Sequence, residues 1–156
     1  MSASTSRKRS AASSQSRPHK PPTYFLDRSL GRFKLATALR QAGLLVEVHN
    51  DHFQQDATDE EWLTGVGQRG WVVLTKDEKI RYHAQELRAL VSRGVRAFVL
   101  TARNVNADEM ASIVLGARTK IERFLAKHAG PFMVTISRGG TLAVLWPESG
   151  RKKASR

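Results

Sequence analysis

The sequence predicts a three-layer α/β/α fold, in which a mainly parallel sheet has helices on both faces. Short apolar stretches typical of buried strands alternate along the chain with longer stretches of helical spacing. Strands that alternate with helices form βαβ units, and such units build parallel sheets. The last two apolar stretches flank Arg138-Gly139-Gly140, which indicates a C-terminal β-hairpin at an edge of the sheet.

The strands are predicted from runs of branched and aromatic residues bounded by Gly, Pro or polar residues. The first run, Thr23-Tyr24-Phe25-Leu26-Asp27, starts directly after two prolines and ends in an acid. Later runs have the same apolar character, and the last two lie between Pro131 and Pro147. The predicted strands cover residues 23–27, 44–48, 71–75, 95–101, 132–137 and 141–146.

The helices are predicted from their caps and from apolar residues at helical spacing. Thr58 with Glu61, and Asn106 with Glu109, have the spacing of a capping box, so a helix should begin at each place. A glycine just past the last apolar residue ends a helix, as Gly43 does for the first. The predicted helices cover about residues 30–42, 58–69 and 83–93, followed by one long helix over 106–128.

Size and composition limit the class of protein. The 156 residues fit one domain, and 40% of them are hydrophobic, which suffices for a core. The lack of cysteine excludes a disulfide scaffold, thiol catalysis and thiolate zinc sites. No segment has the roughly 20 apolar residues of a membrane span. The N-terminus also lacks the apolar core of a signal peptide. We therefore expect a cytoplasmic protein that has no contact with a membrane.

Most of the net charge of +12 lies near the two ends of the chain. Residues 1–22 hold five basic residues and no acid, and residues 148–156 hold four basic residues and one acid. Because both segments are rich in Ser, Lys and Arg, we predict disordered tails around a single domain at 23–147. Such tails attract phosphates or merely keep the protein soluble, and the sequence leaves both interpretations open.

Acidic residues stand at the ends of predicted strands. Asp27 closes the first strand, and Asp77 comes shortly after the third. In a parallel sheet the functional crevice lies beyond the carboxyl ends of the strands. Asp59, in the first turn of the helix before the third strand, reaches that rim only if the 50–57 loop carries it there. Carboxylates that meet repel one another, and their oxygen atoms select hard cations such as Mg²⁺ or Mn²⁺.

Each of these acids also has a purely structural interpretation. Asp27 can cap a helix that begins near Ser29, Asp59 suits the positive end of a helix dipole, and Asp77 is a common turn residue. From the residues alone, metal-dependent phosphoryl chemistry is therefore one hypothesis for an α/β protein.

Three segments, in their order and spacing, resemble the PIN-like domain, and in particular its compact branch related to VapC-type toxins of toxin–antitoxin pairs. The similarity extends from about Thr23 to Trp146. The segments are Tyr24-Phe25-Leu26-Asp27-Arg28-Ser29-Leu30, Ala57-Thr58-Asp59-Glu60-Glu61-Trp62-Leu63 and Val72-Val73-Leu74-Thr75-Lys76-Asp77.

The resemblance implies a PIN-like fold in which Asp27, Asp59 and Asp77 bind Mg²⁺ or Mn²⁺ and act as the catalytic residues. Thr75 matches the small hydroxyl residue beside the last acid, where it would orient ligand or water. The implied function is a metal-dependent endoribonuclease acting on single-stranded RNA, the toxin of a pair that an antitoxin protein inhibits; a homodimer is left open. Lys79 stands where compact relatives often carry a second Asp. A non-catalytic nucleic-acid-binding or regulatory PIN-like domain is therefore the alternative.

Basic residues flank the proposed acids. Arg28, Arg32 and Lys76 are candidates for holding RNA phosphates, because each is close in sequence to Asp27 or Asp77. A solvated or salt-bridged rim explains the same residues equally well, and the sequence does not decide between the two.

Overall fold

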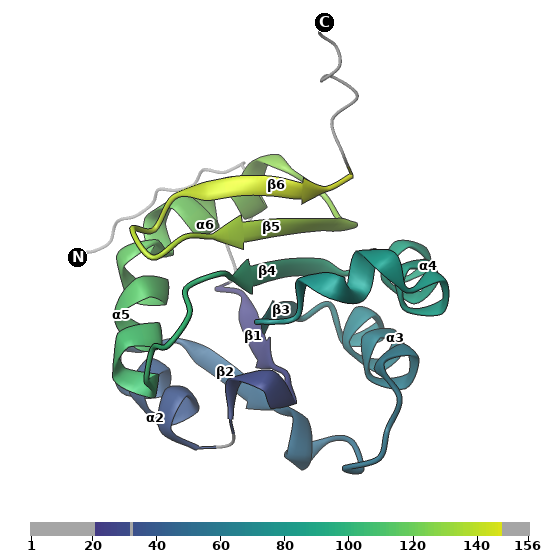
Figure 1. Ribbon diagram of the computed structural model, residues 1–156, viewed down its shortest axis with the longest axis horizontal. Coiled ribbons are helices and arrows are strands. Elements are labelled where there is room, and N and C mark those ends of the chain that lie inside the picture. The colour runs from purple at the N-terminus through teal and green to yellow at the C-terminus, as the bar shows by residue number, and fades with distance from the viewer. Residues whose placement is uncertain (1–20, 32, 148–156) are drawn as a thin grey trace, which may run out of the picture.

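The computed structural model describes residues 21–31 and 33–147 (Figure 1). Residues 1–20, Arg32 and residues 148–156 lie outside the described residues, so the two predicted tails stay predictions. Within the described ranges, no helix combines the length and the apolar character that crossing a membrane requires.

A six-stranded sheet forms the centre of the molecule, in the order β2-β1-β3-β4-β5-β6. The first five strands in the chain run parallel, and β6 pairs antiparallel with β5. The mainly parallel sheet and the C-terminal hairpin are therefore confirmed. The strands are β1 (Thr23–Leu26), β2 (Leu45–Val48), β3 (Val72–Thr75), β4 (Arg96–Leu100), β5 (Phe132–Ile136) and β6 (Leu142–Trp146).

Helices cover both faces of this sheet, which confirms the three-layer prediction. Figure 1 shows α3 and α4 on one side, and α2 with α5 on the other. Three short 3-10 helices, which the sequence did not predict, follow the carboxyl ends of β1, β2 and β3. The helices are α2 (Lys34–Gln41), α3 (Asp59–Arg69), α4 (Ala84–Ser92), α5 (Ala107–Gly116), α6 (Arg118–Lys127), η2 (Arg28–Leu30), η3 (His49–Asp51) and η4 (Glu78–Tyr82).

Alternation along β1 and β3 decides which face their last residues share. Tyr24 and Leu26 belong to the core beneath α2, α5 and α6, whereas Phe25 belongs to the core beneath α3 and α4. Val73 of β3 belongs to that second core as well. Since side chains alternate with a period of two, Asp27 follows Phe25, and Thr75 follows Val73, on the face that α3 covers.

Helix α3 begins at the carboxyl end of the sheet because a helix that connects parallel strands runs back antiparallel to them. Its capping box is complete: the Glu61 N–H donates to Thr58 Oγ1 at 3.1 Å, and the Thr58 N–H donates to Glu61 Oε1 at 2.7 Å. The helix also contains Gly67, where an added Cβ atom would lie 2.4 Å from the Arg93 Cβ. The glycine therefore permits close packing against the end of α4.

The single long helix predicted over 106–128 is wrong in one respect, because the chain breaks it at Ala117 into α5 and α6. Ala117 has φ −93° and ψ 0°, and it follows Gly116, a residue that weakens helices. The break lets the two helices take different partners. α5 packs on α2, while Phe124 of α6 contacts the rings of Phe98 and Phe132, with centroid distances of 6.1 and 4.9 Å.

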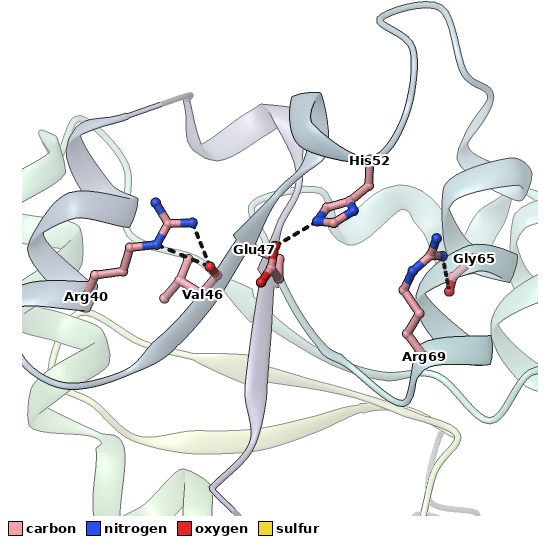
Figure 2. A network of polar contacts seen from close by, with 6 residues as sticks. All are labelled: Arg40, Val46, Glu47, His52, Gly65 and Arg69. Carbon is pink, nitrogen blue, oxygen red and sulfur yellow. Dashed lines mark hydrogen bonds and ion pairs between the residues drawn. The ribbon is translucent and has the colours of Figure 1, made fainter.

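Polar contacts fasten the edge strand β2 and the loop that follows it (Figure 2). The Arg40 guanidinium donates to the Val46 carbonyl oxygen from Nε at 3.2 Å and from Nη2 at 2.7 Å. This contact covers a carbonyl that an edge strand would otherwise expose. Glu47 of β2 pairs with His52 at 2.7 Å. This contact holds the first part of the loop that leads to α3.

We predict that Thr58→Ala lowers the free energy of unfolding by about 1 kcal/mol, since the cap of α3 loses its acceptor. Chemical denaturation followed by circular dichroism measures the change. Thr58→Ser keeps the hydroxyl and should stay close to wild type; a Ser variant as unstable as the Ala variant would contradict a capping role.

Candidate functional site

The carboxylate of Asp27 is the most buried acid at the carboxyl rim of the sheet. It directly follows β1, its side chain is 6% exposed, and its backbone N–H donates to the Leu74 carbonyl of β3 at 3.3 Å. Asp27 Oδ1 accepts from the N–H of Ser29 at 2.9 Å and from the Ser29 hydroxyl. Asp27 Oδ2 accepts from Thr75 Oγ1 at 2.6 Å. Both carboxylate oxygen atoms are therefore held in place by neighbouring donors.

Thr75 links this carboxylate to the second acid. Its hydroxyl is fully buried, donates to Asp27, and accepts from the N–H of Asp77 at 2.9 Å. Asp77 in turn caps η4, since its Oδ1 accepts from the Lys79 N–H at 2.9 Å. The ends of β1 and β3 thus bring Asp27 and Asp77 together around one threonine.

Burial raises the pKa of Asp27 above its usual value, because a charged carboxylate loses solvation there. The hydrogen bonds from Ser29 and Thr75 act in the opposite direction, and the charge of Asp77 raises the pKa further. A surface aspartate could cap η2 without this burial. An acid that is buried beside a second acid at a strand end is therefore a candidate for function rather than for capping alone.

Asp59 occupies the first turn of α3, on the same face as Asp27. Its Oδ1 accepts from the indole Nε1 of Trp62 at 2.8 Å, and the Trp62 ring stacks on Phe25 at a centroid distance of 5.6 Å. Both contacts lie on the α3 side of β1. Burial and the charge of Arg28 lower the pKa of the nearby His49, and the Asp59 carboxylate opposes that shift.

The structure brings two of the three predicted acids, Asp27 and Asp77, into one hydrogen-bonded unit. The unit consists of Asp27, Ser29, Thr75 and the backbone N–H of Asp77. Asp59 stands at the start of α3 with the Trp62 indole as its partner. Among the described residues, no group of three or more His, Cys, Asp or Glu side chains is close enough to hold one ion. A site shared by all three acids stays a prediction, and the structural interpretation of each acid as a cap or first-turn residue also describes its local contacts.

The basic residues proposed for RNA are placed differently from one another. The Arg28 guanidinium donates to the carbonyl oxygens of Gln55 and Ala57, and so fastens the 50–57 loop to η2. Lys76 contacts this rim through its backbone, whose N–H donates to Ser29 Oγ at 2.9 Å. Arg32 lies outside the described residues. Beside Arg28 is a hollow of about 210 Å³, lined by Arg28, Gly31, Val48, His49, Asn50 and Gln55.

Ser29 is the residue at this rim that sequence reasoning did not assign to the site. Its hydroxyl contacts Asp27 and lies 3.3 Å from Thr75 Oγ1, and it accepts from the Lys76 N–H. The Asp-x-Ser spacing is a local sign of a cap. The contact with Thr75, 46 residues further on, becomes visible only when β1 and β3 pair.

Comparison with known proteins assigns the chain to a family. The family model described as "PIN like domain" matches residues 22–102. The chain belongs to the PIN-like domain family. It is also 30% identical over 125 residues to a protein of Mycobacterium tuberculosis (strain ATCC 25618 / H37Rv) described as "Putative ribonuclease VapC45". That match covers 78% of this chain and 90% of the relative. No solved structure matches this chain significantly.

The PIN-like match contains every residue of the hydrogen-bonded unit and Asp59. It starts just before β1 and extends past β4, so β5 and β6 lie beyond it. The predicted membership of the PIN-like family is therefore confirmed, and the matched segment includes the rim that carries Asp27 and Asp77.

We predict that, in metal-free buffer, Asp27→Asn gains stability relative to wild type at neutral pH. A raised pKa means that the folded state binds the proton of Asp27 more tightly than the unfolded chain does. The ionised carboxylate therefore costs stability above its folded-state pKa, and this cost disappears as the pH falls below the unfolded value of about 3.9. Urea denaturation of both proteins from about pH 8 to about pH 4 measures the difference. A difference between the two proteins that grows toward low pH would contradict the assignment.

Proposed function

We propose that this PIN-like domain is a metal-dependent endoribonuclease that hydrolyses phosphodiester bonds of single-stranded RNA. The observation that carries the proposal is the buried Asp27 carboxylate, held through Thr75 beside Asp77 at the carboxyl rim of the sheet. Similarity to a protein described as a putative ribonuclease supports the substrate class. The family resemblance supports the requirement for a divalent ion.

The donor set at the rim fits Mg²⁺ or Mn²⁺. Asp27 and Asp77 offer carboxylate oxygens, Ser29 and Thr75 add hydroxyls, and the chain has no cysteine thiolate that would favour a softer ion. Mg²⁺ in phosphoryl-transfer sites commonly binds through one or two carboxylates together with substrate phosphates. Two carboxylates at one rim would thus suffice for such an ion. Its charge would offset the cost of burying the Asp27 carboxylate, which raises the pKa of Asp27, and the smaller repulsion from Asp77.

When bound, such an ion polarises a phosphoryl oxygen and makes water a stronger nucleophile near neutral pH. The chain's own residues would do the positioning. Thr75 and Ser29 keep the Asp27 carboxylate in one orientation, so that no ordering is needed when substrate arrives. Asp59 would complete the acid set from the start of α3, and its carboxylate would then exchange the Trp62 indole for the site. Arg28, Arg32 and Lys76 would hold the phosphates on either side.

We place this nuclease as the toxin of a toxin–antitoxin pair, with an antitoxin protein as its inhibitor. The resemblance to the compact VapC-type branch and the similarity to VapC45 support this assignment. A protein that acts on cellular RNA would work in the cytoplasm. Induced expression should arrest growth, and co-expression of an adjacent small gene product should relieve the arrest.

The decisive test is cleavage of defined single-stranded RNAs by the pure protein. Wild type should cleave in Mn²⁺ and not in EDTA. Asp77→Asn keeps a capping side chain for η4 and removes one charge, so it should lower kcat by a factor of about 100 or more.

Asp59→Asn tests the acid that the structure leaves apart. Its amide oxygen can still accept from the Trp62 indole, so the fold should be retained while cleavage falls. Asp108→Asn is the matched control, because Asp108 is also an aspartate in the first turn of a helix that a capping box opens, at the second residue of α5. Asp108→Asn should cleave like wild type. RNA binding without cleavage in any divalent ion would favour the non-catalytic alternative, and full activity of Asp59→Asn would remove that residue from the site.

A further inference from the structure

Among the residues that the structure describes, two aromatic residues, Phe33 and Tyr82, are strongly exposed, and both stand at the rim that carries the acids. Phe33 is 71% exposed and Tyr82 is 68% exposed. Phe33 follows η2 after β1, and Tyr82 ends η4 after β3. Because β1 and β3 are adjacent parallel strands, both segments leave the sheet at the same edge. The helix η4 begins after its capping residue Asp77 and ends at Tyr82, whose side chain is exposed to solvent.

The backbone around Tyr82 is fixed although its ring is exposed. Ile80 is fully buried in the core beneath α3 and α4, which anchors η4 from below. The His83 N–H donates to the Ile80 carbonyl at 3.1 Å, and the His83 side chain pairs with Glu86 at 2.7 Å. Tyr82 is thus held between an anchored turn and the first turn of α4. Because the backbone is anchored, only the two side-chain torsions of Tyr82 need ordering when its ring binds a flat ligand.

The surroundings of the ring suit a nucleobase. The Arg81 guanidinium lies over the Tyr82 ring, with its Cζ atom 4.5 Å from the ring centroid. Arginine paired with an exposed aromatic ring is the combination that single-stranded nucleic-acid sites use for stacking bases. Asp77 and Glu78 would repel an acidic partner in this segment, but Lys76, Lys79 and Arg81 outnumber them.

The position of Tyr82 also fits a strand that passes Asp77. A 3-10 helix rises about 2 Å per residue, so Tyr82 stands roughly 10 Å beyond Asp77 along η4. A strand stacked at about 3.4 Å per nucleotide covers that length with about three nucleotides.

We propose that Tyr82, backed by Arg81, is a stacking platform for one base of single-stranded RNA, about three nucleotides from the bond near Asp77. The proposal rests on the proposed function, because it takes the RNA substrate as its ligand. It assigns to the exposed ring a role in affinity, and it leaves the chemistry to the acids.

Binding in EDTA tests the platform apart from cleavage. Fluorescence anisotropy would compare a labelled single-stranded RNA with an oligomer of the same length and charge whose riboses lack bases. Wild type should bind the RNA more tightly than the abasic oligomer. Tyr82→Ala should weaken RNA binding by a factor of about 5 or more, and leave the abasic affinity unchanged.

Two further variants make the test specific. Tyr82→Phe keeps the ring and should bind like wild type. Leu45→Ala is the matched control, because Leu45 is also an exposed apolar side chain, 49% exposed, but begins β2 at the amino end of the sheet. Leu45→Ala should leave both affinities unchanged, and circular dichroism melting should show that all variants are folded.

Each outcome separates the platform from the nuclease. If Tyr82→Ala loses affinity equally for both oligomers, or loses none, the platform is wrong and the exposed ring belongs to another partner, such as a protein. Cleavage by wild type would still support the nuclease in that case. If wild type fails to cleave but its preference for bases disappears in Tyr82→Ala, the platform stands and the nuclease proposal fails.

Discussion

The hydrogen bond between Thr75 and Asp27 is the contact on which the rim of this PIN-like domain depends. It joins the carboxyl ends of β1 and β3 through two residues that are 48 positions apart in the sequence. The hydrogen bond is buried, since Asp27 is only 6% exposed. Pairing of the two strands fixes its geometry, and the Ser29 cap fixes the other carboxylate oxygen. The unit places a buried charge beside Asp77, an arrangement that raises the pKa of Asp27 and that a cation would stabilise.

Much of the fold could be predicted from the sequence because local signals and packing agree. The capping boxes at Thr58 and Asn106 begin helices where predicted, and the six apolar runs became the six strands. The break at Ala117 escaped prediction because apolar spacing continues across it, while only the positions of Phe98 and Phe132 require α6 to turn. The short 3-10 helices are similarly set by strand ends rather than by a periodic pattern.

The candidate site could be predicted only as far as strand order allows. The rule that function lies beyond the carboxyl ends of parallel strands selected Asp27 and Asp77. In the structure the Thr75 hydroxyl links the Asp27 carboxylate to the backbone N–H of Asp77. The part played by Ser29 depends on tertiary pairing, so no local motif reveals it. Whether Asp59 joins the unit is a question of side-chain position, because its carboxylate contacts Trp62 here. Exposure separates Tyr82 from the core aromatics, and sequence alone does not report exposure.

A crystal structure with Mn²⁺ tests the central claim most directly. We expect an anomalous-scattering peak within about 2.5 Å of carboxylate oxygens of both Asp27 and Asp77. A map from the same crystals would also show whether Asp59 has left the Trp62 indole. A protein saturated with Mn²⁺ that shows no peak at this rim, or a peak bound by other residues alone, would contradict the account.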